Sequence, residues 1–249
     1  MRDAPSAPFG SSLDSSPAAR PPWTQIDTVL LDMDGTLLDL RFDNYFWLEL
    51  VPRRYAQRHE LTLEAAREQL IPRFAARQGT LEWYCTDFWS SELALDLRAL
   101  KHEMRERVCF LPGAEEFLQA LVDRGRRTVL VTNAHRDALA VKAGQTGLAR
   151  YFDTMISSHD FGAPKEHDAF WRMLSDRLSF DPQRTLFIDD SLPVLRAARR
   201  HGLAHIIAAC HPDTTQDART VTEFPTVRRV EELLGALLET PGKNKNSRG

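Results

Sequence analysis

Four short, almost continuously apolar runs constrain the fold of this chain more than any other feature of its sequence. They are rich in Val, Ile and Leu, and they cover residues 27–32, 127–132, 185–189 and 204–209. Runs of this length without polar alternation are typical of strands that are buried on both faces, as in a parallel sheet. A weaker run at residues 153–157 predicts a further strand between the second and the third.

Helical patterns separate the later runs, and they cover residues 114–124, 137–145, 166–178 and 192–201. Gly125, Gly147 and Gly202 follow three of these patterns, as expected where helices end. Strands that alternate with helices predict an α/β fold, an open, doubly wound parallel sheet of the Rossmann-like kind with crossover connections.

The connection after the first run is far longer than the roughly 30 residues of one strand–helix–strand unit. Its pattern is helical from residue 42 to residue 107, and Pro52, Pro72 and Gly79 mark kinks or boundaries within it. We therefore expect an inserted helical cap at residues 42–107, and an α/β core made of residues 23–41 and 108–239.

The two ends of the chain have the composition of disordered tails. Residues 1–22 are rich in Pro, Ser and Ala and contain no apolar stretch of the kind found in secretory signals. Residues 240–249 have a similar character, and neither end can bury enough apolar surface to offset the entropy of ordering. We predict disordered tails at residues 1–22 and 240–249.

Charge and cysteine content narrow the function classes. The 32 Lys and Arg against 35 Asp and Glu give a net charge of −3, so there is no general basic field for nucleic acid. No apolar run approaches the roughly 18 residues that a membrane span needs. Cys85, Cys109 and Cys210 show neither disulfide nor zinc-knuckle spacing, which favours a cytoplasmic protein. The oligomeric state is left open.

Carboxylates follow two of the predicted strands. Asp32 and Asp34 come after the first strand in the sequence DMDGT, with Gly35 allowing a tight turn, and Asp189 and Asp190 end the run at 185–189. The carboxyl ends of parallel strands line one crevice, which would bring these groups together. So much negative charge in one place calls for a cation, and oxygen ligands favour Mg²⁺.

Three further residues can supply the other half of a phosphate site. Thr132 and Asn133 end the second strand and offer a hydroxyl, an amide and a helix N-terminus to an anion. Lys165 precedes another predicted helix and offers an ammonium group. Each would, in isolation, be a helix cap or a surface charge, but together they predict binding of a small phosphorylated substrate.

These ordered motifs resemble those of the haloacid dehalogenase superfamily, from about residue 27 to residue 238. The resemblance implies that Asp32 is the nucleophile that forms an aspartyl phosphate, and that Asp34 is the general acid and then the general base. It implies that Thr132 and Lys165 bind the transferring phosphoryl group, and that the long insert is a cap that closes over the site.

The same resemblance implies the ligands of the metal ion. Mg²⁺ would be held by Asp32, by the backbone carbonyl of Asp34 and by Asp190, with Asp189 bound directly or through water.

Within that superfamily the chain is similar to the bacterial GMP/IMP nucleotidases, through the runs DTVLLDMDGTLLDLRFDNYFW, LEWYCTDFWS, TNAH, FGAPKE and RTLFIDDS. This similarity implies a 5′-nucleotidase that hydrolyses purine mononucleotides. Arg41, Asn44 and Tyr45 lie just past the nucleophile loop, and by position they are candidates for substrate specificity, although hinge packing would equally explain them.

Other functions remain possible from these residues. A phosphatase or phosphomutase acting on a sugar phosphate would use the same four motifs. A dehalogenase would need no acid at Asp34, and a protein that only binds nucleotides would need no complete catalytic set.

Overall fold

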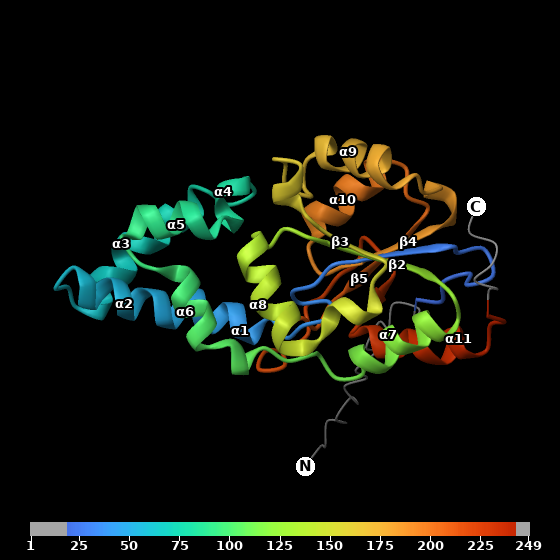
Figure 1. Cartoon of the computed structure of the whole chain (residues 1–249), viewed down its shortest axis with the longest axis horizontal. Coiled ribbons are helices and arrows are strands. Elements are labelled where there is room, and N and C mark those ends of the chain that lie inside the picture. The colour runs from blue at the N-terminus through green and yellow to red at the C-terminus, as the bar shows by residue number, and fades with distance from the viewer. Residues whose placement is uncertain (1–18, 243–249) are drawn as a thin grey trace, which may run out of the picture.

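The computed structural model describes residues 19–242 and contains a six-stranded, wholly parallel sheet with a helical lobe beside it (Figure 1). The strand order is β3-β2-β1-β4-β5-β6. The strands are β1 (Thr28–Leu31), β2 (Arg127–Thr132), β3 (Thr154–Ser157), β4 (Thr185–Asp189), β5 (His205–Ala209) and β6 (Thr226–Val227). The predicted α/β class, with a parallel sheet and an inserted cap, is confirmed.

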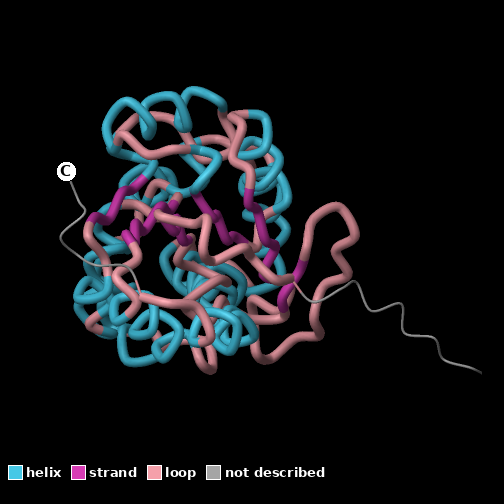
Figure 2. Tube along the Cα trace, turned by 90° about the vertical axis from the view of Figure 1, so that its right-hand side faces the viewer, coloured by secondary structure: helices cyan, strands magenta, loops and turns pink. Residues whose placement is uncertain are grey.

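Helices cover both faces of the sheet, as Figure 2 shows, with cyan helices on either side of the magenta strands. The α-helices of this part of the chain are α7 (Ala114–Asp123), α8 (Arg136–Thr146), α9 (Asp168–Leu178), α10 (Leu192–Arg200) and α11 (Leu234–Leu238). Short 3₁₀ turns join them at η3 (Leu148–Tyr151), η4 (Ser158–Asp160), η5 (Pro182–Arg184) and η6 (Val230–Leu233).

Alternation along the strands divides the core into two layers. Val29 and Leu31 pack with residues of α7 and α11, whereas Leu30 packs with residues of α9 and α10. Figure 1 shows these two helix pairs on opposite sides of the sheet. All three leucine or valine side chains are fully buried, which explains why the strand is apolar throughout.

The cap begins with α1 (Arg41–Tyr45), which runs through a π-helical turn, η1 (Phe46–Leu50), into α2 (Val51–Arg58). It continues through α3 (Leu63–Ala75), α4 (Leu81–Tyr84), α5 (Thr86–Leu93), α6 (Leu97–Glu103) and the 3₁₀ turn η2 (Arg105–Arg107). In Figure 1 these helices form the left-hand lobe.

Aromatic side chains form the centre of the cap. The ring of Phe74 lies 5.0 Å from that of Trp89 and 5.7 Å from that of Trp47, in edge-to-face contacts. Trp83 completes the group at 6.3 Å from Phe74. Large rings can fill the space between short helices, so the cap has its own apolar core.

Residues that precede residue 23, the predicted start of the α/β core, already pack against the sheet. Ala19 is buried, its amide donates to the carbonyl of Thr226 in β6, and the Trp23 ring packs 6.3 Å from that of Phe117. Ala19, which lies within the predicted tail, is therefore packed on the edge strand of the sheet. Residues 1–18 of that predicted tail and residues 243–249 of the other lie outside the described residues.

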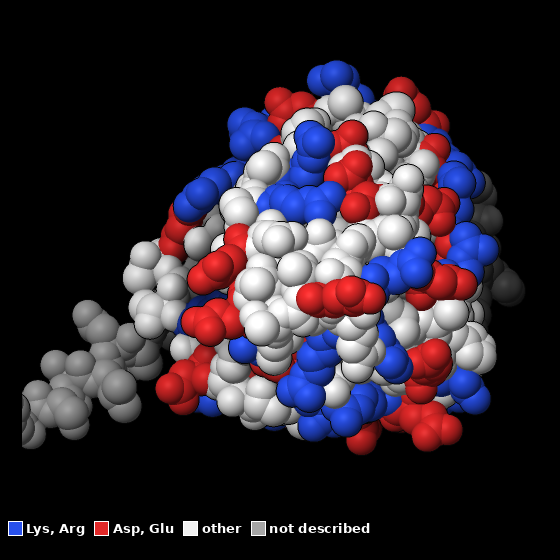
Figure 3. All heavy atoms as spheres, turned by 90° about the vertical axis from the view of Figure 1, so that its left-hand side faces the viewer, with Lys and Arg blue, Asp and Glu red and all other residues white. Residues whose placement is uncertain are grey.

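In residues 19–242, no helix is long and apolar enough to span a lipid bilayer. The cap end of the molecule carries interspersed basic and acidic side chains, as Figure 3 shows.

Candidate active site

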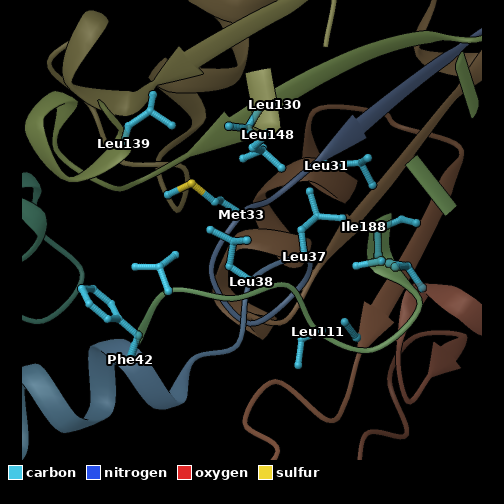
Figure 4. Packing of buried hydrophobic residues seen from close by; sticks show 14 of the residues in the cluster. Leu31, Met33, Leu37, Leu38, Phe42, Leu111, Leu130, Leu139, Leu148 and Ile188 are labelled. Carbon is cyan, nitrogen blue, oxygen red and sulfur yellow. The ribbon is translucent and has the colours of Figure 1, made fainter. Parts of the chain in front are cut away.

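The register of the central strands brings the carboxylates together. Leu31 of β1 pairs with Leu130 of β2 and with Ile188 of β4, and Figure 4 shows these three side chains near the end of β1. Asp32 directly follows β1 and Asp189 ends β4, and the Asp32 amide donates to the Ile188 carbonyl at 3.0 Å. Neighbouring parallel strands therefore end in two adjacent acids.

The three carboxylates of Asp32, Asp189 and Asp190 form a cluster in which each offers an oxygen within 4.8 Å of the others. Lys165 reaches into this cluster. Its Nζ donates to Asp32 Oδ1 at 2.5 Å, to Asp189 Oδ2 at 2.7 Å and to the Val131 carbonyl at 3.0 Å. The ammonium group is thus aimed at the carboxylates by three acceptors.

Lys165 and Arg219, which contacts Asp190 at 3.0 Å, bring two positive charges to three acids and do not neutralise them fully. Burial raises the pKa of Asp32 to about 7, although Lys165 opposes the shift and Asp189 adds to it. Burial and the charge of Asp32 raise the pKa of Asp190 to about 7, and burial raises that of Asp189 to about 6. The site lacks positive charge, and its carboxylate oxygens are the ligands that Mg²⁺ prefers, so these residues fit that ion.

Asp34 lies in a different group of charges, two residues further on. Lys142 of α8 donates to Asp34 Oδ1 at 2.6 Å and to Asp43 Oδ2 of α1, also at 2.6 Å. Lys101 of α6 donates to the other oxygen of Asp43 at 3.4 Å. The Lys142 and Lys101 side chains are buried, and the ammonium of Lys101 lies 4.2 Å from the centre of the Phe46 ring.

This alternating group, Asp34, Lys142, Asp43 and Lys101, links the core to the first and last α-helices of the cap. Burial raises the pKa of Asp34 in spite of Lys142. Burial opposes ionisation of Asp43, but Lys142 and Lys101 outweigh it and lower the pKa of that carboxyl. The sequence reasoning missed Lys142, Asp43 and Lys101, because a lysine or aspartate within a helical pattern is usually a solvated surface residue.

Gly35 lies where the loop after β1 passes Asp190. Its φ is +86°, and a Cβ at this position would lie 2.9 Å from Asp190 Oδ2 and 2.8 Å from Pro212 Cβ. Arg219 holds the same Asp190 oxygen at 3.0 Å. Only glycine leaves room for this arrangement.

Replacing Gly35 with Ala should therefore lower the free energy of unfolding by about 2 kcal/mol or more and weaken Mg²⁺ binding, since backbone strain and displacement of Asp190 act together. Gly79→Ala is the matched control, because Gly79 has a φ of +80° with nothing within 4 Å of its added Cβ. It should cost about 1 kcal/mol and leave Mg²⁺ binding unchanged. Urea unfolding and calorimetric Mg²⁺ titration measure both, and equal losses of Mg²⁺ affinity would contradict the argument.

Thr132 and Asn133 lie at the end of β2, as predicted. Thr132 Oγ1 accepts the amide of Ala134 at 3.0 Å, whereas α8 has His135 as its N-cap residue. The Asn133 side chain accepts the Lys165 amide at 2.9 Å and donates to Glu166 Oε2 at 2.9 Å. Both ends of this amide are therefore engaged in holding the loop that carries Lys165.

The cap contacts this loop through Tyr84. Its hydroxyl donates to Glu166 Oε1 at 2.5 Å. Burial raises the pKa of Tyr84 and the Glu166 carboxylate adds to the shift, so the phenol stays protonated and can donate. Tyr84 and Glu166 link the cap to the loop that carries Lys165, and the sequence reasoning did not find this link.

The three residues chosen by position for specificity are all held by local partners. Arg41 contacts Asp39 at 3.3 Å and Cys109 Sγ at 3.0 Å. Asn44 donates to Asp213 at 2.6 Å. The Arg107 guanidinium lies 4.3 Å from the centre of the Tyr45 ring. These contacts tie the start of the cap to the core, as expected of a hinge.

Comparisons with known proteins agree with this geometry. The model of a family described as haloacid dehalogenase-like hydrolase matches residues 26–202. The GMP/IMP nucleotidase YrfG of Escherichia coli K12 is 40% identical over 216 residues, which cover 87% of this chain and 97% of that protein. A phosphorylated carbohydrates phosphatase of Thermotoga maritima is 23% identical over 224 residues, 86% of this chain and 99% of its own length.

Solved structures share the fold. The crystal structure of a HAD phosphatase from Thermococcus onnurineus superimposes with a TM-score of 0.74 at 22% identity, covering 88% of this chain and all 100% of that one. An L-2-haloacid dehalogenase from Xanthobacter autotrophicus gives a TM-score of 0.57 at 18% identity, covering 86% and 99% of the two chains.

Proposed function

The chain belongs to the haloacid dehalogenase-like hydrolases and is a phosphoric monoester hydrolase, and we propose that its substrates are purine nucleoside 5′-monophosphates such as GMP and IMP. The observation that carries the proposal is the 40% identity to a GMP/IMP nucleotidase along 87% of the chain. The cluster of acids and Lys165 at the strand ends supports phosphoryl transfer chemistry for such a substrate.

In the first step the Asp32 carboxylate attacks phosphorus and an oxygen–phosphorus bond forms, giving an aspartyl phosphate. The bond from phosphorus to the 5′-oxygen breaks, and that oxygen takes a proton from Asp34 and leaves as the nucleoside hydroxyl. Lys165 and the Thr132 hydroxyl bind the phosphoryl oxygens during the transfer. The raised pKa of Asp34, caused by burial, favours the protonated form that this step requires.

In the second step Asp34, now a carboxylate, takes a proton from a water molecule that attacks the phosphorus of the aspartyl phosphate. The bond to Asp32 breaks, inorganic phosphate leaves, and both aspartates return to their starting states. Lys142 lies 2.6 Å from Asp34 and stabilises the carboxylate between the two steps.

Asp32, Asp190 and the backbone carbonyl of Asp34 would hold Mg²⁺, with Asp189 beside them. When bound, the ion neutralises charge between the nucleophile and the phosphoryl oxygens. The cap, anchored by Tyr84 on Glu166, keeps bulk water away from the reacting atoms.

A screen of phosphate release with and without Mg²⁺ tests the proposal. Nucleoside monophosphates and sugar phosphates are compared at equal concentration, and we expect kcat/KM to be highest for GMP or IMP and activity to be lost in EDTA. A maximum on a sugar phosphate would refute the purine assignment, and isomerisation of a sugar phosphate without phosphate release would instead identify a phosphomutase.

A further inference from the structure

A second group of metal-binding side chains lies apart from the carboxylates. Cys85, His135 and His159 place one ligand atom each, a sulfur and two ring nitrogens, within 4.8 Å of one another. Cys85 lies between α4 and α5 in the cap, whereas His135 begins α8 and His159 lies in η4, both in the core. No step of the proposed reaction uses these three groups.

The His159 ring has a nitrogen that is available to bind a metal ion. Its Nε2 is buried and has no hydrogen-bond partner among residues 19–242, which is costly for a polar atom. Burial, with the neighbouring charges of His135 and Arg136, lowers the pKa of His159 to about 4, so the imidazole is neutral at pH 7. A neutral imidazole is the form that binds metals.

The other two side chains each place a ligand atom beside the His159 ring. His135 Nδ1 accepts the amide of Asp137 at 3.4 Å, which leaves Nε2 for a ligand, and Asp87 Oδ2 lies 3.6 Å from that nitrogen. Cys85 is a free thiol, and its sulfur accepts a weak hydrogen bond from the Phe88 amide at 3.4 Å. The two imidazole rings meet edge to face with centres 4.8 Å apart. That packing explains their closeness to each other but not the thiol beside them.

We propose that Cys85, His135 and His159 bind a zinc ion. One sulfur and two imidazole nitrogens are ligands that zinc takes in tetrahedral geometry, and a water molecule would fill the fourth position. Mg²⁺ prefers oxygen ligands alone, so the two sites of the molecule select different ions.

The ligands of this site come from both lobes, and this determines what zinc does. Cys85 is next to Tyr84, the cap residue that contacts the loop carrying Lys165, and His135 is two residues beyond Asn133. A bound ion therefore ties the cap to the core beside the active site. Since a cap must open to admit substrate and release product, zinc should slow turnover.

Co²⁺ can replace Zn²⁺ as a spectroscopic probe of this site. In excess Mg²⁺, which occupies the carboxylate site, Co²⁺ should bind one equivalent per chain and give the ultraviolet charge-transfer band of a cobalt thiolate. Zn²⁺ added afterwards should remove the band. Cys85→Ser should abolish it, and the fold should survive because serine is a favourable N-cap residue for α5.

Matched variants complete the spectral experiment. Cys210→Ser removes another half-buried thiol, and it should leave the band unchanged. His159→Gln keeps the thiol but removes one nitrogen, and it should weaken Co²⁺ binding about tenfold or more. No band in the unsubstituted protein, or a band that persists in Cys85→Ser, would overturn the proposal. Should Cys85→Ser fail to fold by circular dichroism, unchanged binding in His159→Gln would overturn it instead.

Turnover of p-nitrophenyl phosphate tests the consequence. With Mg²⁺ in excess, Zn²⁺ should inhibit the unsubstituted protein and Cys210→Ser, and the same Zn²⁺ should leave Cys85→Ser about as active as without it. Equal inhibition of all three would place the effect at the carboxylates and refute the link to the cap. The spectral arm does not depend on the substrate, so it stands whether or not purine nucleotides are hydrolysed.

Discussion

Replacing Asp32 with Asn should abolish phosphate release from every substrate, with kcat lowered by about 10⁴-fold or more, since the nucleophile is lost. The effect should be the same for a nucleotide and for p-nitrophenyl phosphate, because both need the aspartyl phosphate. Malachite green detection of phosphate measures this loss directly.

The fold should tolerate this substitution. The amide oxygen of Asn can still accept from Lys165, which donates to Asp32 Oδ1 at 2.5 Å, and one of three crowded negative charges disappears. Without added Mg²⁺ the melting temperature should therefore stay equal or rise. If Asp32→Asn kept more than about 1% of the original activity, measured at about the same Mg²⁺ concentrations, the assignment of Asp32 as the nucleophile would be contradicted.

Replacing Lys142 with Met should give a loss that depends on the leaving group. Lys142 holds Asp34 at 2.6 Å, and without it the acid is free to turn away from the leaving oxygen. A nucleoside oxygen needs a proton to leave, whereas p-nitrophenolate does not. We expect kcat/KM to fall about 100-fold for GMP and less than about 10-fold for p-nitrophenyl phosphate. The quantity kcat/KM covers the steps up to departure of the leaving group, so it includes this proton transfer.

Lys101→Met is the matched control for that variant. Lys101 is a buried lysine of the same group, but it contacts Asp43 at 3.4 Å and not Asp34. Lys142→Met leaves the Asp34 carboxylate without its partner and should lose about 3 kcal/mol of stability, whereas Lys101→Met should lose less, because Asp43 keeps its 2.6 Å contact with Lys142. Only Lys142→Met should change the ratio between the two substrates. The same ratio in both variants would mean that Lys142 is merely structural.

Much of the fold follows from the sequence because the central strands are buried on both faces. Runs such as 127–132 and 185–189 coincide with β2 and β4 to the residue. By contrast, β6 covers only Thr226 and Val227, and two residues carry no periodicity. The contact of Ala19 with this edge strand was equally hidden, because a proline-rich segment gives no local sign of the carbonyl it will meet.

In the candidate site, too, some contacts could be predicted from the sequence and others could not. Asp32 and Asp189 could be predicted to meet, because strand ends in a parallel sheet are neighbours whatever the sequence between them, and the order of the motifs placed Lys165 with them. Lys142 could not, because it lies within α8, away from any strand end, and its contacts with Asp34 and Asp43 depend on how the cap packs on that helix. From the sequence alone, its position in α8 would be taken as solvent-exposed. The side chain is buried only because the cap packs on that helix.

The central place of β1 also has a consequence for how the chain reaches its structure. Thr28 pairs with Arg127 on one side and with Thr185 on the other, so the first strand to be synthesised is the one whose neighbours come late. Pairings this distant must close long loops before they gain any contact energy, and they fold slowly. During synthesis, the cap can form its aromatic core before β2 and β4, the two strands that pair with β1, have been made. Asp32 and Asp189 can therefore come together only after β4 has been synthesised and has paired with β1.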